Sequence, residues 1–268
     1  MSWLLNGEIN GTLSPLDRGL AYGDGVFRTL KVIDRKPVWW RDQYAKLMHD
    51  CTVLQLDCPH ASLLLSEIET VTQQLVNAAV KIVITRGPGE RGYASPEPAT
   101  STRIVLASAL SEQARMLQGA RVRWCSLRLA RQAQLAGVKH LNRLENVLAR
   151  QEWSDPDIAE GLLCDDTGAV IGGTRSNVFA MRQNTLLTPD LNLSGIAGVT
   201  RDRILRAAAQ RGIEIQVARL EPANILDADE VFLSNSIVGL LPVAKLDNRQ
   251  WRSTTWTTQF QQWIDEAD

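Results

Sequence analysis

The stretch Gly137-Val138-Lys139-His140-Leu141-Asn142-Arg143-Leu144-Glu145-Asn146-Val147-Leu148 places one lysine at the end of an apolar stretch, just before a segment with helical spacing. Its residues Leu141, Leu144, Val147 and Leu148 recur every three or four residues, which predicts a helix in this segment. Asn142, followed three residues later by Glu145, has the pattern of a capping box and places Lys139 just outside that helix. A lysine partly withdrawn from water can act as a nucleophile or a base. Most lysines are solvated surface residues, so the rest of the chain must decide between the two interpretations.

The overall composition argues against several classes of partner. The chain has 268 residues, of which 44% are hydrophobic, enough for one large or two modest domains with buried cores. Its 29 Lys and Arg residues balance 30 Asp and Glu residues, with a formal net charge of -1, so neither a nucleic acid nor a membrane surface is expected as a partner. No apolar run reaches the roughly 18 residues that a membrane-spanning helix needs.

The four cysteines point to the cellular compartment. Cys51, Cys58, Cys125 and Cys164 are scattered without metal-ligand spacing, so no metal site is expected. The first residues read as folded sequence, without a signal peptide. We therefore expect reduced, mostly buried thiols in a cytoplasmic protein.

Hydrophobic periodicity predicts a mixture of strands and helices. In the first part of the chain it predicts strands over 3–5, 25–32, 79–85 and 103–109 and a helix over 41–56. In the second part it predicts strands over 161–164, 177–180 and 185–187 and a helix over 200–211. The predicted fold class is therefore α+β. We expect a smaller N-terminal α/β domain over 1–109, a connector over 110–118, and a larger C-terminal domain over 119–268 that carries Lys139.

Two segments have the character of a phosphate site. Gly195-Ile196-Ala197-Gly198-Val199-Thr200-Arg201 places glycines directly before a helix, where free backbone N–H groups attract anions and Thr200 adds a hydroxyl. Ser234-Asn235-Ser236 follows an apolar strand and could complete a phosphate cup. Each pattern alone is also typical of an ordinary helix start or turn.

A glycine-rich arginine loop is the third element. Ile84-Thr85-Arg86-Gly87-Pro88-Gly89-Glu90-Arg91-Gly92-Tyr93 leaves a strand and carries two arginines and a tyrosine. An arginine fork binds a carboxylate with two hydrogen bonds, so Arg91 with Tyr93 is a candidate substrate contact. Arg28, on the strand after Tyr22-Gly23-Asp24-Gly25, is a second candidate. A charged surface loop and a solvated strand arginine are the alternatives.

In order and spacing, these segments resemble the fold-type IV pyridoxal-phosphate enzymes. This group contains branched-chain aminotransferases, D-amino-acid aminotransferases and 4-amino-4-deoxychorismate lyases. The resemblance runs through nearly the whole chain, including Asp17-Arg18-Gly19-Leu20-Ala21-Tyr22-Gly23-Asp24-Gly25-Val26-Phe27 and Ser176-Asn177-Val178-Phe179. The arginine loop and Lys139-His140-Leu141-Asn142-Arg143-Leu144-Glu145 look most like the aminodeoxychorismate lyases.

The resemblance implies a function and a set of roles. It implies a homodimer of two-domain subunits in which pyridoxal 5'-phosphate lies between the domains and is bound by Lys139 as a Schiff base. Lys139 would then act as base and acid while 4-amino-4-deoxychorismate becomes 4-aminobenzoate and pyruvate, on the folate pathway. It further implies a set of other contacts: the cofactor phosphate on Lys46, Gly198, Val199, Thr200 and Ser236, and the substrate carboxylates on Arg91, Tyr93 and Arg28.

Two positions depart from the pattern of this family. Lys46 occupies the place of an arginine that usually grips the phosphate, so the charge is kept but the fork is lost. Gly172 occupies the place where many relatives carry a glutamate opposite the pyridine nitrogen. A lyase tolerates that loss better than a transaminase, because formation of an aromatic ring drives its reaction.

Two other functions stay open at this point. One is an aminotransferase for D-amino acids or branched-chain amino acids, which shares the lysine and the cofactor. The other is a non-catalytic cofactor-binding homologue, suggested by Lys46 and Gly172 and opposed by the presence of Lys139 and the arginine loop.

Overall fold

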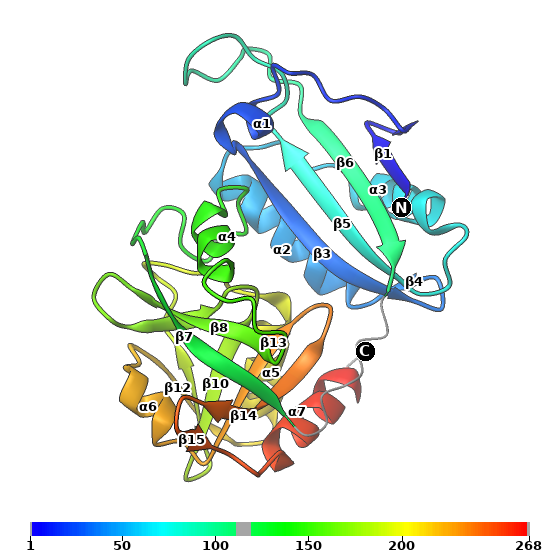
Figure 1. Ribbon diagram of the computed structural model, residues 1–268. Coiled ribbons are helices and arrows are strands. Elements are labelled where there is room, and N and C mark those ends of the chain that lie inside the picture. Colours follow the sequence, from blue (N-terminus) through cyan, green and yellow to red (C-terminus); the bar gives the residue numbers. More distant parts are fainter. Residues whose placement is uncertain (1, 111–118, 267–268) are drawn as a thin grey trace. The chain divides into compact units, whose positions relative to one another are not determined.

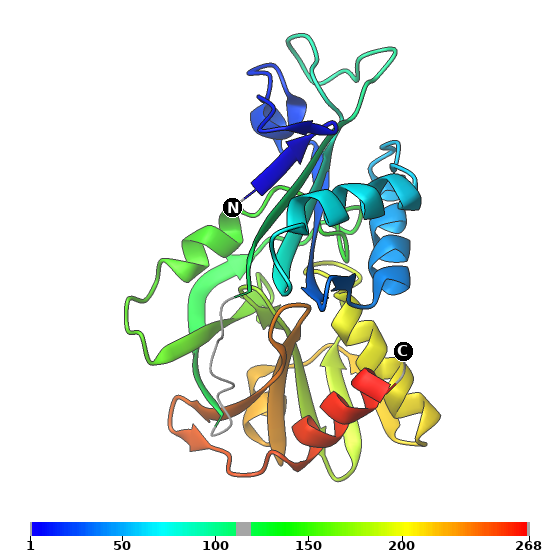
Figure 2. The same ribbon diagram turned by 90° about the vertical axis from the view of Figure 1, so that its right-hand side faces the viewer.

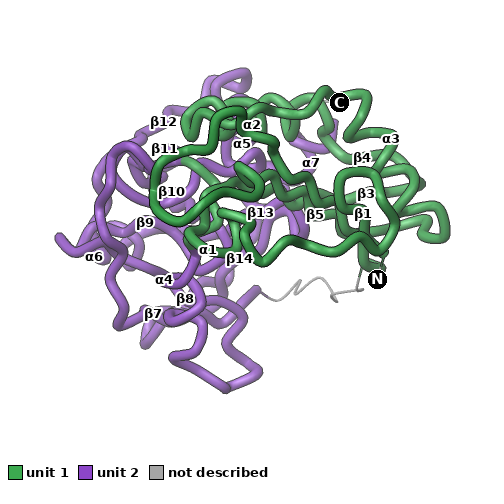
Figure 3. Tube along the Cα trace, turned by 90° about the horizontal axis from the view of Figure 1, so that it is seen from above, with its two compact units in different colours: residues 1–112, 138–142 green, residues 113–137, 143–268 purple. Residues whose placement is uncertain are grey.

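The computed structural model describes residues 2–110 and 119–266, which form two compact units (Figure 3). Unit 1 comprises Met1–Glu112 and Val138–Asn142, and unit 2 comprises Gln113–Gly137 and Arg143–Asp268. The lysine segment was expected in the second domain, but its packing groups it with unit 1. The predicted connector at 110–118 lies almost wholly outside the described residues.

Unit 1 is built on a six-stranded antiparallel sheet (Figure 1). In spatial order its strands are β2 (Glu8–Ile9), β1 (Ser2–Leu5), β6 (Thr102–Ala109), β5 (Ala78–Thr85), β3 (Gly25–Ile33) and β4 (Lys36–Pro37). The predicted strands of the first part are confirmed, because alternating β-branched residues give β3, β5 and β6 one buried face each. The long pairing of β3 with β5 runs from Gly25 opposite Thr85 to Val32 opposite Ala78.

Two helices, α2 (Trp40–Val53) and α3 (Ala61–Thr72), cover one face of this sheet (Figure 2). On β3, Val26 and Leu30 point toward these helices and are fully buried. Arg28 lies between them on the same alternating face and is also buried, which places a cation against the apolar core. A short third helix, α1 (Arg18–Tyr22), precedes β3.

The lysine segment extends this sheet beside β3. The backbone N–H of Phe27 donates to the carbonyl of Lys139 at 2.9 Å, and that of Leu141 donates to the carbonyl of Gly25 at 2.9 Å. His140 forms a bridge with Val26. The position of Lys139 is therefore fixed by sheet hydrogen bonds, as for a residue on a strand.

Unit 2 contains a mixed sheet of nine strands. In spatial order they are β12 (Glu214–Ala218), β11 (Thr185–Pro189), β10 (Asn177–Arg182), β13 (Glu230–Asn235), β14 (Gly239–Leu246), β7 (Ala120–Leu129), β8 (Ile158–Asp165) and β9 (Val170–Gly173), with β15 (Arg249–Gln250) paired to β14. The pairs β11–β12, β14–β7 and β7–β8 are parallel, and the others are antiparallel. This unit therefore differs from the purely antiparallel sheet of unit 1.

Four helices accompany this sheet: α4 (Leu144–Arg150), α5 (Val199–Gln210), α6 (Pro222–Leu226) and α7 (Thr255–Glu266). Helices α5 and α7 lie side by side (Figure 2), and Arg203 on α5 donates a hydrogen bond of 2.8 Å to the carbonyl of Ile264 on α7. Phe232 links the layers, because its ring stacks on Phe179 and also contacts Phe260. Within the described residues, no helix is both long and apolar enough to cross a lipid bilayer.

The helix after Lys139 starts later than predicted. Helix α4 begins at Leu144, and its N-cap residue Arg143 makes no side-chain capping bond. The predicted capping box is wrong, because the Glu145 carboxylate accepts a hydrogen bond of 2.8 Å from the backbone N–H of Ala130 instead. Glu145 therefore makes a tertiary contact with Ala130 instead of capping the helix.

Candidate functional site

Both backbone groups of Lys139, its N–H and its carbonyl, form hydrogen bonds, and its side chain is half-buried. Its backbone N–H donates to Oδ2 of Asp50 at 3.2 Å. Its Nζ lies 4.5 Å from the ring centre of Phe27. The structure therefore gives this lysine a fixed backbone and an aromatic neighbour, a setting suited to a positioned amine.

Asp50, on α2, links Lys139 to two further cations. Its side chain is fully buried, its Oδ1 accepts a hydrogen bond from Nζ of Lys46, and its Oδ2 lies 3.9 Å from Nη2 of Arg28. Burial lowers the pKa of both Lys46 and Arg28, and the nearby carboxylate opposes that change. Asp50 was not identified from the sequence, because its role depends on contacts between α2, β3 and the lysine segment.

The start of α5 offers donors to an anion. Gly198 is the N-cap residue and has no side-chain capping bond, and the hydroxyl of Thr200 is buried without a hydrogen-bond partner among the described residues. Asn177 shapes the approach, since it accepts from the N–H of Gly198 at 3.2 Å and donates to the carbonyl of Ile196 at 2.8 Å. A Cβ on Gly198 would lie 2.5 Å from that Asn177 oxygen, so a larger residue there would require the Asn177 side chain to shift. A helix start with an orphaned hydroxyl fits a phosphate group.

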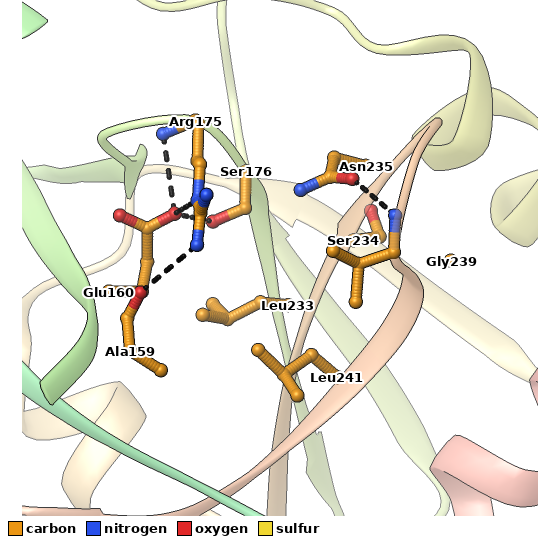
Figure 4. A pocket seen from close by; sticks show the side chains of 10 residues that line it. Ala159, Glu160, Arg175, Ser176, Leu233, Ser234, Asn235, Gly239 and Leu241 are labelled. Carbon is orange, nitrogen blue, oxygen red and sulfur yellow. Dashed lines mark hydrogen bonds and ion pairs between the residues drawn. The ribbon is translucent and has the colours of Figure 1, made fainter. Parts of the chain in front are cut away.

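A pocket of unit 2 lies at the end of β13 (Figure 4). It encloses about 260 Å³ of space, part of it open to solvent, and is lined by Glu160, Arg175, Ser176, Ser234 and Asn235, among others. The hydroxyl of Ser234 is buried and has no hydrogen-bond partner among the described residues. Unsatisfied buried hydroxyls usually mark a place where a ligand or water completes the bonding.

The turn after β13 carries the predicted Ser236. Asn235 holds this turn, because its side-chain oxygen accepts from the N–H groups of Ile237 and Val238 at 2.9 and 2.8 Å. Ser236 is half-buried within it. Ser234 and Asn235 therefore both line the pocket, and Asn235 also braces the turn that contains Ser236.

Glu160 organises the loop that follows Gly172. Its carboxylate accepts from the hydroxyls of Thr174 and Ser176 and from the N–H of Arg175. A Cβ on Gly172 would lie 2.8 Å from the carbonyl oxygen of Ser176. The backbone thus closes onto this glycine and leaves no room for a glutamate without a shift of the loop.

The arginine loop is anchored by residues other than its own Arg91. Arg86 forms a two-bond ion pair with Asp24 at 2.8 and 3.1 Å and also binds the carbonyls of Leu54 and Gln55. Burial alone would raise the pKa of the Asp24 carboxyl, but its hydrogen bonds to Arg86 and to Arg18 lower this pKa below the usual value. Arg86 is therefore structural.

Arg18 is the second anchor. It pairs with Asp24 at 2.9 Å and donates to the carbonyls of Gly92, Tyr93 and Ala94 at 3.0, 2.9 and 3.1 Å. From the sequence, Arg18 was named only as part of the segment 17–27, and its anchoring of the arginine loop was not predicted. The loop is held by its backbone, and its side chains stay available.

Arg91 and Tyr93 are presented by this anchored loop. Both are exposed, Tyr93 to 85%, and the Tyr93 ring lies 5.3 Å from that of Tyr22. Unit 1 thus contains Lys139, Lys46, Arg28, Arg91 and Tyr93. Unit 2 contains the other predicted contacts: Gly198, Val199, Thr200 and Ser236.

Comparison with known proteins gives a consistent result. Residues 25–246 match the family model of class IV amino-transferases. The chain is 35% identical to an aminodeoxychorismate lyase of Vibrio harveyi, over 85% of each chain. Its fold matches a 4-amino-4-deoxychorismate lyase from Pseudomonas aeruginosa with a TM-score of 0.93 and 38% identity, over 99% of this chain and 98% of that one. A branched-chain amino acid aminotransferase from Escherichia coli shares the fold at a TM-score of 0.83 and 24% identity, over 97% and 92% of the two chains.

Proposed function

The chain belongs to the class IV amino-transferase family, and on that premise we propose that it is an aminodeoxychorismate lyase. It converts 4-amino-4-deoxychorismate to 4-aminobenzoate and pyruvate, a step of folate biosynthesis. The observation that carries this proposal is similarity to two lyases along most of the chain, with Lys139 fixed beside β3. The closed turn at Gly172 supports a lyase over an aminotransferase, because it leaves no place for a carboxylate that would strengthen a transaminase.

Pyridoxal 5'-phosphate is the proposed cofactor, and the residues present fit it. Among solved structures with this fold is a PLP-bound aminotransferase from Mycobacterium tuberculosis. At the start of α5 the hydroxyl of Thr200 is buried, and no described residue bonds to it, which suits a group that binds phosphate. Lys139 would bind the cofactor covalently, and a second set would hold its phosphate: Lys46, Gly198, Val199, Thr200 and Ser236. When bound, the cofactor supplies the electron sink for the reaction.

The protein's own residues then handle binding and proton transfer. The amine of Lys139 takes the proton from the carbon that bears the substrate amine and returns a proton to the departing enolpyruvyl group, which leaves as pyruvate. Its backbone bonds to Phe27 and Asp50 keep that amine in place. Arg91 and Tyr93 bind substrate carboxylates from the loop that Arg18 anchors.

A homodimer in the cytoplasm completes the proposal. In the single chain, the apolar residues of α4 face solvent, with Leu144, Val147 and Leu148 exposed to 68, 49 and 47%. In unit 1, Leu16 and Leu20 are exposed to 63 and 65%. Apolar side chains exposed to this degree on short segments are typical of surfaces that a second subunit covers. All four cysteines are free, in keeping with a reducing compartment.

Product formation from the aminated chorismate tests the proposed function. The purified protein with pyridoxal phosphate should release equal amounts of 4-aminobenzoate and pyruvate, and it should transaminate D-alanine and branched-chain amino acids far more slowly. Transamination of D-alanine as fast as release of 4-aminobenzoate would instead favour an aminotransferase. Failure to bind pyridoxal phosphate at all would overturn both assignments.

Replacing Thr200 with valine should change stability and cofactor affinity in opposite directions. Valine removes a buried hydroxyl that bonds to no residue in the described part of the chain, so the cofactor-free protein should gain about 1 kcal/mol in free energy of unfolding. The same change removes a hydrogen bond to phosphate, so the Kd for pyridoxal phosphate should rise about tenfold. Thermal unfolding and an absorbance titration measure the two effects. Equal affinity in the two proteins would remove Thr200 from the phosphate site.

Replacing Arg91 with lysine should raise KM for the substrate about 10- to 100-fold with little change in cofactor content. Lysine keeps the charge but cannot form the two-bond contact with a carboxylate. Arg91 is exposed and makes no contact that any described residue depends on, so stability should be unchanged. Steady-state kinetics and cofactor absorbance provide the measurement. Unchanged KM would show that substrate carboxylates bind elsewhere.

A further inference from the structure

The buried cluster formed by Arg28, Lys46 and Asp50 contains more positive than negative charge. The side chains of Arg28 and Asp50 are 4% and 0% exposed, and that of Lys46 is 17% exposed. Lys46 is bonded to Asp50, so these two charges offset each other. The cluster therefore has one net positive charge, that of Arg28.

Arg28 is poorly satisfied by the protein alone. Its Nη2 lies 3.9 Å from Asp50, longer than a hydrogen bond, and its Nε donates to the carbonyl of Phe27 at 3.3 Å. Its Nη1 is buried and has no hydrogen-bond partner among the described residues. A buried guanidinium in this state is costly unless an anion lies near it.

His49 is the other titratable group on Asp50. Its Nδ1 lies 3.3 Å from Oδ1 of Asp50, but its side chain is 61% exposed. Water therefore screens any charge it carries far more than it screens the buried groups. The balance of the cluster is set by Arg28, Lys46 and Asp50.

We propose that Arg28 serves the cofactor phosphate rather than the substrate, by giving the Lys46–Asp50 pair the net positive charge that attracts a phosphate. This inference rests on the proposed function, since it assumes that Lys46 meets the phosphate of pyridoxal phosphate. Lys46 is the most exposed member of the cluster and contacts the phosphate. Arg28 does not contact the phosphate but attracts it electrostatically, because its charge is poorly screened in the protein interior. Arg28, Lys46 and Asp50 together thus provide the positive charge that a single phosphate-binding arginine would provide at the position of Lys46.

The test compares pyridoxal phosphate with pyridoxal, which lacks the phosphate, on the full chain freed of cofactor. In Arg28→Met the cluster becomes neutral, so the Kd for pyridoxal phosphate should rise about tenfold while that for pyridoxal stays the same. Arg28→Lys keeps the charge and should keep the preference for the phosphorylated form. The double variant Arg28→Met/Asp50→Asn restores one net positive charge and should recover that preference.

Arg103→Met is the matched control. Arg103 also lies in unit 1 and pairs with a carboxylate, Glu67, at 2.6 Å, so its loss removes one charge elsewhere in the unit. It should leave the ratio of the two dissociation constants unchanged.

Three outcomes would overturn the inference: an unchanged ratio in Arg28→Met, an equal loss of both ligands, or no recovery in the double variant. If Arg28→Met does not fold, a lost preference in Arg28→Lys would overturn it in the same way. A wild-type protein that binds neither ligand would instead overturn the proposed function.

Discussion

Replacing Lys139 with alanine is expected to abolish lyase turnover, with a loss of at least about 10⁴-fold in kcat. Lys139 provides both the covalent attachment of the cofactor and the group that moves the proton, so its loss removes both functions. Formation of 4-aminobenzoate measures the loss. Borohydride reduction of the wild-type holoenzyme, followed by peptide mapping, should locate the cofactor on Lys139.

Lys81 is a demanding control for this assignment. Its Nζ lies 4.8 Å from the ring centre of Phe27, against 4.5 Å for Lys139, so both amines lie against the same ring. Lys81 comes from β5 and lacks the bond to Asp50 that fixes Lys139. Lys81→Ala should therefore retain most of the turnover and the cofactor adduct. An adduct on Lys81, or on no lysine, would contradict the role of Lys139.

Sequence periodicity predicted the helices and strands in which buried apolar residues recur at a regular spacing. Strands β3, β5 and β10 and helix α5 appear within one or two residues of their expected bounds. β3 and α5 each have a regular buried face, and β10 is a short apolar run that is buried almost throughout. β7, which carries alternating arginines, was not predicted. Three of its residues, Arg121, Arg123 and Arg128, interrupt the apolar pattern although the strand lies in the middle of the sheet of unit 2.

The candidate site could be predicted only where its chemistry is local. The helix start at Gly198 and Thr200 is visible from adjacent glycines and a hydroxyl. The anchors of the site were not visible, because Asp50 reaches Lys139 across 89 positions and Arg18 reaches Tyr93 across 75. A side chain that bonds a distant backbone group leaves no periodic signal in the sequence.

The place of Arg28 shows the same limit. Arg28 was interpreted as a candidate contact for a substrate carboxylate, with a solvated strand arginine as the alternative. The alternation of β3 instead turns it toward α2, where Asp50 is buried. The alternation of side chains along a strand predicts that Arg28 shares a face with Val26 and Leu30. It does not predict that the helix packed on this face, α2, carries a carboxylate.

Replacing Gly172 with glutamate is expected to destabilise the protein and not to create a transaminase. From electronic reasoning alone, a carboxylate opposite the pyridine nitrogen would strengthen the electron sink and favour transamination. At this position, however, a Cβ would lie 2.8 Å from the backbone oxygen of Ser176, and the site is buried on β9. Overpacking and a buried unpaired charge together should cost about 3–5 kcal/mol, which would lower Tm by roughly 10 °C.

Gly172→Ala separates the two causes, because it makes the contact with Ser176 without adding a charge. It should cost only about 1–3 kcal/mol and keep more of the lyase activity than the glutamate variant. Thermal unfolding and half-transamination of D-alanine are the two measurements. The adjoining loop is already tied to Glu160 by three hydrogen-bonding residues, so a second carboxylate there would meet a like charge and a backbone with little freedom to move. A glutamate variant that kept the wild-type Tm and transaminated D-alanine rapidly would show that this loop can open, and that the missing carboxylate alone separates this chain from its aminotransferase relatives.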